Sequence, residues 1–172
     1  KIMKFFRQSL IVLSSILASL LSFVGSANSD GHGEFKLGVV TFLSGPAAEP
    51  FGVPAWNGGK LFIKLLNEGK APAPYNKKGF GGMKITAIPI DESGGATKQV
   101  EELRNLVQRD KVDAVLGYVS SGDCMAIPSV ADELQALTVL YDCGTPRVFE
   151  DASYKYVFRT AAHAAMDNIA IA

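Results

Sequence analysis

The sequence contains few of the residues that metal centres and nucleophilic active sites require. There are only two cysteines and two histidines among 172 residues. His32 lies near the N-terminus and His163 near the other end, so neither has a second histidine at ligand or catalytic spacing. We therefore expect no metal site, and His163 is more typical of a surface or interface residue than of a catalytic base.

The motifs that bind nucleotides or present a serine nucleophile are also absent. Neither G-x-G-x-x-G nor G-x-x-x-x-G-K-[ST] occurs, which removes the common dinucleotide and phosphate-binding loops. No G-x-S-x-G elbow occurs either, and the nearest stretch, Gly117–Gly122, has the wrong spacing. These absences predict a chain that holds no cofactor and is not an enzyme.

An excess of basic charge is lacking as well, because 17 lysines and arginines balance 17 aspartates and glutamates. Nucleic-acid binders normally carry a basic surplus, so we expect no nucleic acid partner. Apolar residues make up 48% and charged residues 20%, which is typical of a folded domain and excludes a disordered or collagen-like chain. The length corresponds to about one domain.

The N-terminal segment has the layout of a secretory signal peptide. Three basic residues, Lys1, Lys4 and Arg7, precede an apolar run at 10–24 and small residues at 25–27. The run is shorter than the ~20 residues of a membrane span, and a membrane anchor is the alternative. No cysteine follows the run to accept a lipid.

Cleavage after Ala27 would leave 14 basic and 17 acidic residues, a net charge of −3. We predict a signal peptide at 1–27, a flexible mature N-terminus at 28–34 and a folded unit at 35–172. The mature chain would then be exported and would not be an integral membrane protein.

Beyond residue 34 the sequence alternates between two kinds of apolar pattern. Short apolar runs rich in β-branched residues predict strands at 35–42, 83–90, 112–118, 137–141 and 156–159. Amphipathic patterns predict helices at 55–68, 97–110, 122–135 and 164–172. Strands that alternate with helices indicate βαβ units, and therefore an α/β fold with a doubly wound parallel sheet.

The first of these helices carries its apolar residues at helical spacing. Gly59, Phe62, Ile63 and Leu66 fall on one face, which we expect to be buried against the sheet.

In doubly wound sheets the ligand binds outside the carboxyl ends of the strands. The loops that matter are therefore 43–54, 91–96, 119–123 and 142–147. Ser120 and Ser121 begin a helix, where unpaired amides can bind a carboxylate or where serine can simply cap the helix; the residues leave both alternatives open. Thr145 follows the neighbouring strand, so the three side chains can converge on one anion.

The two cysteines, Cys124 and Cys143, follow two adjacent strands of the predicted sheet. An exported chain meets an oxidising compartment, which favours a disulfide. Spacing alone does not give the geometry, so a disulfide and two buried free thiols are equal alternatives.

Four stretches of the chain resemble, in order, the N-terminal part of a known family. They are KLGVVTFLSGPAAEPFG, NGGKLFIKLLNE, KITAIPIDESGGATKQVEELRNLVQRDKVDAVLGYVSSG and YVFRTAAH. They include the S-G-P-x-A first loop at 44–48 and the third-strand pattern at 111–117. The chain resembles the periplasmic substrate-binding proteins of ABC transporters, in particular the leucine/isoleucine/valine-binding family with its type 1 periplasmic-binding fold.

The resemblance implies which residues meet the ligand. Phe51 matches the aromatic residue of the first loop that packs on the ligand, and Ser120 or Ser121 matches the serine that binds the ligand carboxylate. Cys143 and Thr145 match the small residue and the threonine that complete the carboxylate site. Cys143 stands where this family usually has alanine, so the shape of the pocket departs from the pattern.

Two neighbours of Cys143 are further candidates for ligand contact. Tyr141 and Asp142 are both unusual at their positions in such a family. Asp142 can meet a ligand ammonium, although a solvated loop carboxylate is the favoured alternative.

The resemblance also implies a function and a gap. It implies a periplasmic receptor that traps a branched-chain amino acid, an aromatic acid or an amide between two lobes and delivers it to an ABC transporter permease. Residues 35–172 match the first lobe only, so we expect the second lobe to be missing and the 172 residues alone to bind ligand weakly or not at all. The alternatives are a ligand-sensing domain of the same fold and an exported flavodoxin-like enzyme, for which no nucleophile–base pair is visible.

Overall fold

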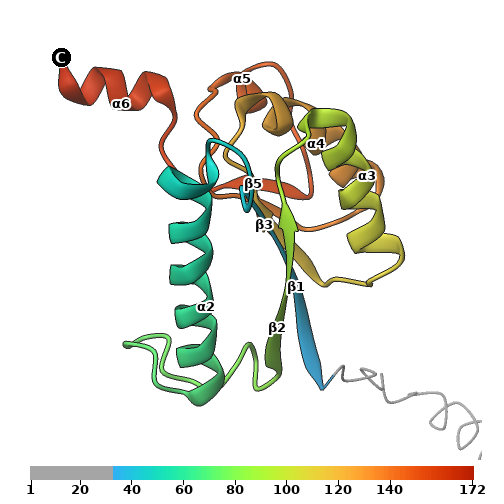
Figure 1. Cartoon of the computed structure of the whole chain (residues 1–172), viewed down its shortest axis with the longest axis vertical. Coiled ribbons are helices and arrows are strands. Elements are labelled where there is room, and N and C mark those ends of the chain that lie inside the picture. Colours follow the sequence, from blue (N-terminus) through green and yellow to red (C-terminus); the bar gives the residue numbers. More distant parts are fainter. Residues whose placement is uncertain (1–32) are drawn as a thin grey trace, which may run out of the picture. The chain divides into compact units, whose positions relative to one another are not determined.

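The computed structural model describes residues 33–172 (Figure 1). The predicted signal peptide at 1–27 and most of the predicted flexible segment lie outside the described residues. The strands are β1 (Glu34–Thr41), β2 (Lys84–Asp91), β3 (Ala114–Gly117), β4 (Thr138–Leu140) and β5 (Val157–Arg159). The helices are η1 (Ala48–Gly52), α2 (Val53–Glu68), α3 (Gly95–Gln108), α4 (Ser121–Glu133), α5 (Arg147–Glu150) and α6 (Ala164–Ile171). Each predicted strand and helix is present, with its ends within two residues of those expected.

The five strands form one parallel sheet in the order β2-β1-β3-β4-β5. The chain passes from β1 to β2 on one side and then to β3 on the other, so its direction of travel reverses between β1 and β3. Ligands of such sheets bind at this reversal, outside the carboxyl ends of the strands. The prediction of an α/β fold with a doubly wound parallel sheet is therefore confirmed.

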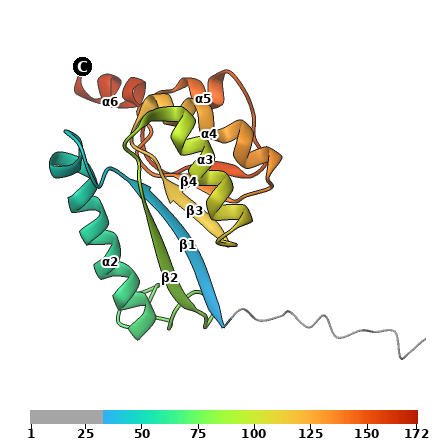
Figure 2. The same cartoon turned by 45° about the vertical axis from the view of Figure 1, so that its right-hand side comes forward.

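The buried core lies between the sheet and the pair α3 and α4. Gly38 in β1 makes room for Leu106 of α3, because a Cβ atom at Gly38 would lie 2.9 Å from Leu106 Cδ1. The main buried side chains of this layer are Val40, Leu103, Leu106, Val115, Tyr118, Ile127 and Leu140. Figure 1 and Figure 2 both show α3 and α4 side by side, with α2 on the other side of the sheet.

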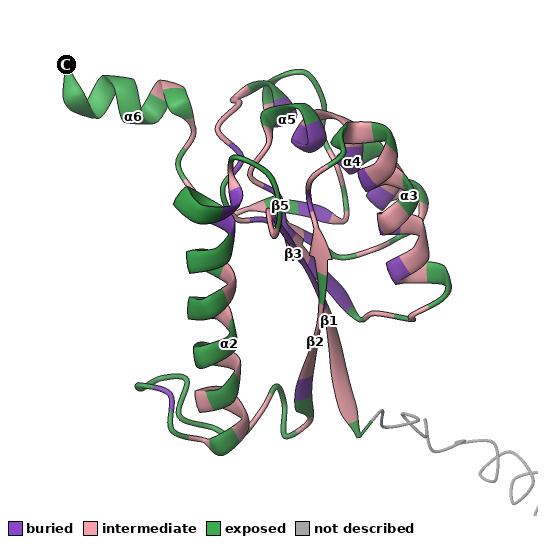
Figure 3. Cartoon of the chain, viewed as in Figure 1, coloured by how far each residue is buried: buried purple, intermediate pink, exposed green. Residues whose placement is uncertain are grey.

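On that other face, α2 turns its predicted apolar side to the sheet and is bonded to β2 at its C-terminal end, where the Asn67 side chain donates to the Ile85 carbonyl at 2.8 Å and accepts from the Ile85 amide at 2.7 Å. Gly59, Phe62, Ile63 and Leu66 all line a cavity of about 490 Å³ that separates α2 from the strands. No residue of α2 is buried, and Phe62 is 43% exposed (Figure 3). The prediction that these residues share the face turned to the sheet is confirmed, whereas the prediction that this face is buried is wrong. On the opposite face α3 and α4 contact each other along their length, whereas α2 contacts the short turn η1, which leaves the cavity open.

Two short helical segments are not predicted from the sequence: η1 lies within the predicted loop 43–54, and α5 begins at the last residue of the predicted loop 142–147. The π-helical turn η1 follows β1 and leads directly into α2, and the single turn α5 follows β4. Segments this short contain too few residues to show a helical period, and their stability comes from tertiary contacts. Both lie at the carboxyl end of the sheet.

Candidate ligand-binding site

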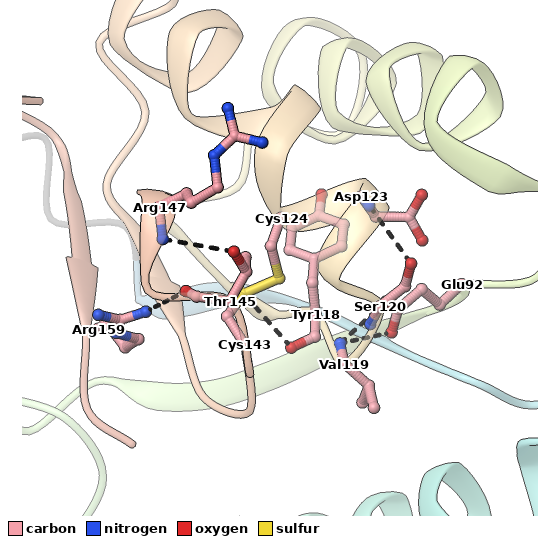
Figure 4. The surroundings of a disulfide bond; sticks show 10 residues. All are labelled: Glu92, Tyr118, Val119, Ser120, Asp123, Cys124, Cys143, Thr145, Arg147 and Arg159. Atoms are coloured by element: carbon pink, nitrogen blue, oxygen red, sulfur yellow. Dashed lines mark hydrogen bonds between the residues drawn. A yellow bond between two sulfur atoms is a disulfide. The ribbon is translucent and has the colours of Figure 1, made fainter. Parts of the chain in front are cut away.

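The loops after β3 and β4 meet at the carboxyl end of the sheet, as their adjacent strands predict. A Cβ atom placed on Gly144 would lie 3.8 Å from Ser121 Oγ, so the loop after β4 lies against the first turn of α4. A disulfide between Cys124 of α4 and Cys143 joins the two segments, with Cα atoms 6.1 Å apart (Figure 4). Of the two alternatives left open by the sequence, the structure has the bonded one.

The disulfide limits what Cys143 can offer a ligand. Both cysteines are fully buried, and each sulfur is bonded to the other. Cys143 therefore has no free thiol, and in this structure it exposes no surface to a ligand. The covalent link holds the Thr145 loop against α4.

The two serines have different positions in the first turn of α4. Ser120 is the N-cap: its Oγ accepts a hydrogen bond from the Asp123 amide at 3.3 Å. Ser121 is exposed, and its amide and that of Gly122 have no hydrogen-bond partner among residues 33–172. Helix N-termini carry such open amides together with a partial positive charge. The carboxylate-binding alternative therefore suits Ser121, and the capping alternative suits Ser120.

Thr145 lies beside an arginine that the sequence analysis did not single out. The Thr145 carbonyl accepts a hydrogen bond from Arg159 Nη1 at 2.6 Å, and Thr145 Oγ1 accepts one from the Arg147 amide at 3.3 Å. The Arg159 guanidinium also stacks 5.3 Å from the Phe149 ring centroid. The sequence did contain one indication of this arginine: Arg159 is the last residue of the predicted strand 156–159, so it lies at the carboxyl end of the sheet, where the ligand is expected.

The remaining candidates lie on other parts of the same edge. Phe51 lies in η1, after β1, and is 55% exposed. Asp142 is exposed on the loop after β4. The Tyr141 hydroxyl donates to Thr41 Oγ1 at 2.8 Å, and its ring lines the cavity beneath α2. Tyr141 is thus already bonded within the sheet.

A family model described as "Periplasmic binding protein" matches residues 34–172. The chain belongs to the periplasmic binding protein family. The match covers all but the first residue of the described part of the chain, and the family resemblance drawn from the sequence is confirmed.

Solved structures of periplasmic binding proteins share the fold. The substrate-binding protein LivJ of Streptococcus pneumoniae, in complex with isoleucine, is 21% identical with a TM-score of 0.64; the match covers 76% of this chain and 34% of that one. The leucine-binding protein LivK of Thermotoga maritima is 22% identical with a TM-score of 0.63, over 80% and 35%. A solute-binding protein of R. palustris in complex with benzoate is 23% identical with a TM-score of 0.62, over 77% and 34%. No match is found among curated protein sequences.

This member of the family thus spans about a third of the length of the solved structures it matches. Among its described residues, no helix is long and apolar enough to cross a membrane, and no group of three His, Cys, Asp or Glu side chains is arranged to hold a metal ion.

Asp91 connects the loops after β1 and β2 of the binding protein. Its carboxylate accepts hydrogen bonds from the Leu43 amide at 3.0 Å, from the Ser44 hydroxyl and from the Ser93 amide and hydroxyl. Partial burial opposes ionisation, but the bonds from Ser44, Leu43 and Ser93 outweigh it and hold the pKa of Asp91 well below its usual range.

Replacing Asp91 with asparagine is expected to lower the free energy of unfolding at pH 7. A group whose pKa is depressed on folding adds stability above its unfolded pKa and loses it as the pH falls. The deficit of Asp91→Asn should therefore narrow below about pH 4. Urea unfolding at pH 7 and pH 3 measures this, with exposed Asp142→Asn as the control. An equal deficit at both pH values would contradict the assignment.

Glu92, the next residue, is the second group that the sequence analysis did not single out. Its side chain is fully buried. Its carboxylate accepts hydrogen bonds from the Val119 amide at 2.8 and 3.0 Å and from the Ser120 amide at 2.7 Å (Figure 4). Glu92 thus connects the end of β2 with the two residues that immediately precede Ser121 and α4.

Proposed function

We propose that this chain is the ligand-binding lobe of an extracytoplasmic receptor of an ABC importer, which captures a small carboxylate and delivers it to a membrane permease. The observation that supports this most is the pair of loops joined by the disulfide. They bring the Ser121 hydroxyl and the open amides of Ser121 and Gly122 beside the loop of Thr145 at the carboxyl end of β3 and β4, next to the reversal point. That geometry suits a carboxylate of a small ligand.

The proposed class of ligand rests on a group that the ligands of two solved relatives share. Isoleucine and benzoate, the ligands of two solved relatives, both carry a carboxylate, although their side groups differ. We propose that this lobe binds the carboxylate and that a second lobe contributes to selecting the rest of the ligand. A branched-chain amino acid and an aromatic acid are therefore both substrates to test.

The capture itself would need a second lobe. The solved relatives are about three times as long as the part of them that this chain matches. We propose that the ligand is held between this lobe and another by hinge closure, and that Phe51, exposed on the first loop, packs on it. The predicted signal peptide at 1–27 would carry the protein to the periplasm, and the chain would have no catalytic role of its own.

Titration of the complete protein tests this proposal. The probes are L-leucine and benzoate, with leucinamide and benzamide as matched ligands that lack the carboxylate. We expect calorimetric binding and a raised unfolding temperature with one acid and neither effect with its amide, because ligand binding to the native state stabilises it. Equal binding of an acid and its amide, or binding of none of the four, would contradict the carboxylate receptor.

Truncation of the two hydroxyl-bearing residues tests the site. Each hydrogen bond to a charged group is worth roughly 1.5–3 kcal/mol, so Ser121→Ala and Thr145→Ala should each weaken binding by about tenfold or more. Ser129→Ala, an exposed serine farther along α4, is the matched control and should leave the affinity unchanged. Calorimetry with the acid that binds gives the affinities. Wild-type affinity in the Ser121→Ala, Thr145→Ala double variant would place the ligand elsewhere.

A further inference from the structure

The backbone that carries Ser121 is held by a buried acidic side chain from another strand. Glu92 lies 27 and 28 residues before its partners Val119 and Ser120, and it makes three short contacts with their two amides. These are the last two amides before α4 begins. A change in the charge or position of the Glu92 carboxylate would therefore alter the hydrogen bonds of the backbone that leads into the first turn of α4.

The same junction has an unfavourable backbone conformation. Tyr118, immediately before Val119, has a φ angle of 131°, in a region that residues with a side chain rarely adopt. Its ring is fully buried, and its hydroxyl has no hydrogen-bond partner. Such a conformation persists only when the surrounding structure holds it. The bonds from the next two amides to Glu92 are among the contacts that do so, together with the burial of the Tyr118 ring.

Glu92 is poised to change its charge near neutral pH. Burial raises the pKa of Glu92 to about 7, against the opposing hydrogen bonds from Ser120 and Val119, and the nearby Asp123 carboxylate raises it further. The ionisable groups that face it are Asp123 from α4, Tyr118 from the end of β3 and Tyr141 from the end of β4. The lysine of the neighbouring helix, Lys98, donates instead to the Ser93 carbonyl.

An anion bound at Ser121 would compete with the negative charge on Glu92. Both would be stabilised by the same helix N-terminus, and two negative charges a few ångströms apart in a partly buried site repel each other. Protonation of Glu92 removes this repulsion. The proton comes from the solvent, the carbonyl oxygen can still accept from the backbone, and the new O–H can donate to Asp123.

We propose that Glu92 is a positioning residue of the carboxylate site, which holds the Tyr118–Ser121 junction through two backbone amides and takes up a proton when the ligand binds. This inference rests on the proposed function, because it needs a carboxylate at Ser121. It adds that capture is coupled to pH, with tighter binding on the acidic side of neutrality.

Calorimetry between pH 6 and 8 tests the coupling, with the complete protein and L-leucine and benzoate as probes, neither of which titrates in this range. If the ligand shifts Glu92 upward by one pKa unit, affinity should fall about fivefold from pH 6 to pH 8. At pH 7.5, buffers of different ionisation enthalpy should show uptake of about half a proton per ligand. Glu92→Gln imitates the protonated form, so it should bind with the acid-side affinity at every pH and take up no proton. Glu101→Gln, on the exposed face of α3, is the control and should behave as wild type.

A wild-type pH profile in Glu92→Gln, or no pH dependence in the wild-type protein, would overturn the inference. Backbone NMR separates this from a failure of the proposed function. The Val119 and Ser120 amide signals should titrate near neutral pH in the wild-type protein without ligand and not in Glu92→Gln. If neither probe binds at any pH but these amides titrate, the carboxylate receptor is wrong and Glu92 still governs the junction. If the amides do not titrate, Glu92 does not have this role.

Discussion

Replacing Gly52 with alanine is expected to be one of the two most damaging single changes in this lobe. Gly52 ends η1, and a Cβ atom there would lie 1.7 Å from the Phe42 carbonyl oxygen and 2.5 Å from the carbonyl carbon. Those atoms belong to the backbone, so no side chain can rotate away. Overpacking usually costs about 1–3 kcal/mol, and we expect Gly52→Ala to reach the upper end because a chain segment must move.

The matched control lies one and a half turns farther on. A Cβ atom at Gly58, inside α2, meets nothing within 4 Å. Alanine is better than glycine in a helix by about 1 kcal/mol, so Gly58→Ala should stabilise the protein slightly. Urea unfolding of both variants gives the two free energies. Ligand titration should show a further loss in Gly52→Ala alone, because Phe51 moves with its neighbour. Equal stability of the two variants would mean that the close approach at Phe42 does not exist.

Removing the disulfide is the second change with a large expected effect. In the chain-entropy model, closing a loop with a sequence separation of 19 stabilises the folded state by about 3 kcal/mol. The double variant Cys124→Ala, Cys143→Ala should lose about this amount of unfolding free energy. It should also bind ligand more weakly, because the Thr145 loop is no longer fixed to α4.

Reductant distinguishes loss of the bond from loss of packing. Wild-type protein unfolded in the presence of dithiothreitol should approach the stability of the double variant, and reductant should not affect the double variant. Thiol quantification under denaturing conditions should find no free thiol in the oxidised wild type. Two free thiols in the untreated protein, together with no effect of reductant, would show that the bond does not form.

The sequence was sufficient to predict the sheet and which loops meet at its carboxyl end, where the candidate site lies. Short apolar runs rich in β-branched residues, such as 112–118, favour strands of a parallel sheet. Alternation with amphipathic segments then placed Ser121 and Thr145 after adjacent strands. The family was predicted from several weak motifs that occur in the expected order. None of these motifs identifies the family by itself.

Three features depended on contacts that sequence patterns do not contain. The apolar face of α2 predicted that this side of the helix faces the sheet. Whether Phe62 is buried there depends on how closely the helix and the strands approach, which the sequence pattern does not contain. The spacing of Cys124 and Cys143 permitted a bond without fixing it, because the distance between their Cα atoms is a property of the folded loops. The sequence pattern places Glu92 in a turn, where a carboxylate is usually exposed to solvent. Its burial results from hydrogen bonds with the amides of Val119 and Ser120, which lie 27 and 28 residues away in the sequence.

The gap beneath α2 has a consequence for the order in which this lobe becomes rigid. The sheet with α3 and α4 contains the continuous buried core and forms one cooperative unit, while α2 contributes no buried residue to it. Helices of this length gain most of their stability from tertiary packing, so α2 settles only when its apolar face is covered. The turn that carries Phe51 is different, because Gly52 lies against the Phe42 backbone and fixes this turn to the end of β1. The residues proposed to meet a ligand, Phe51 included, therefore all lie on the part of the lobe that becomes rigid first.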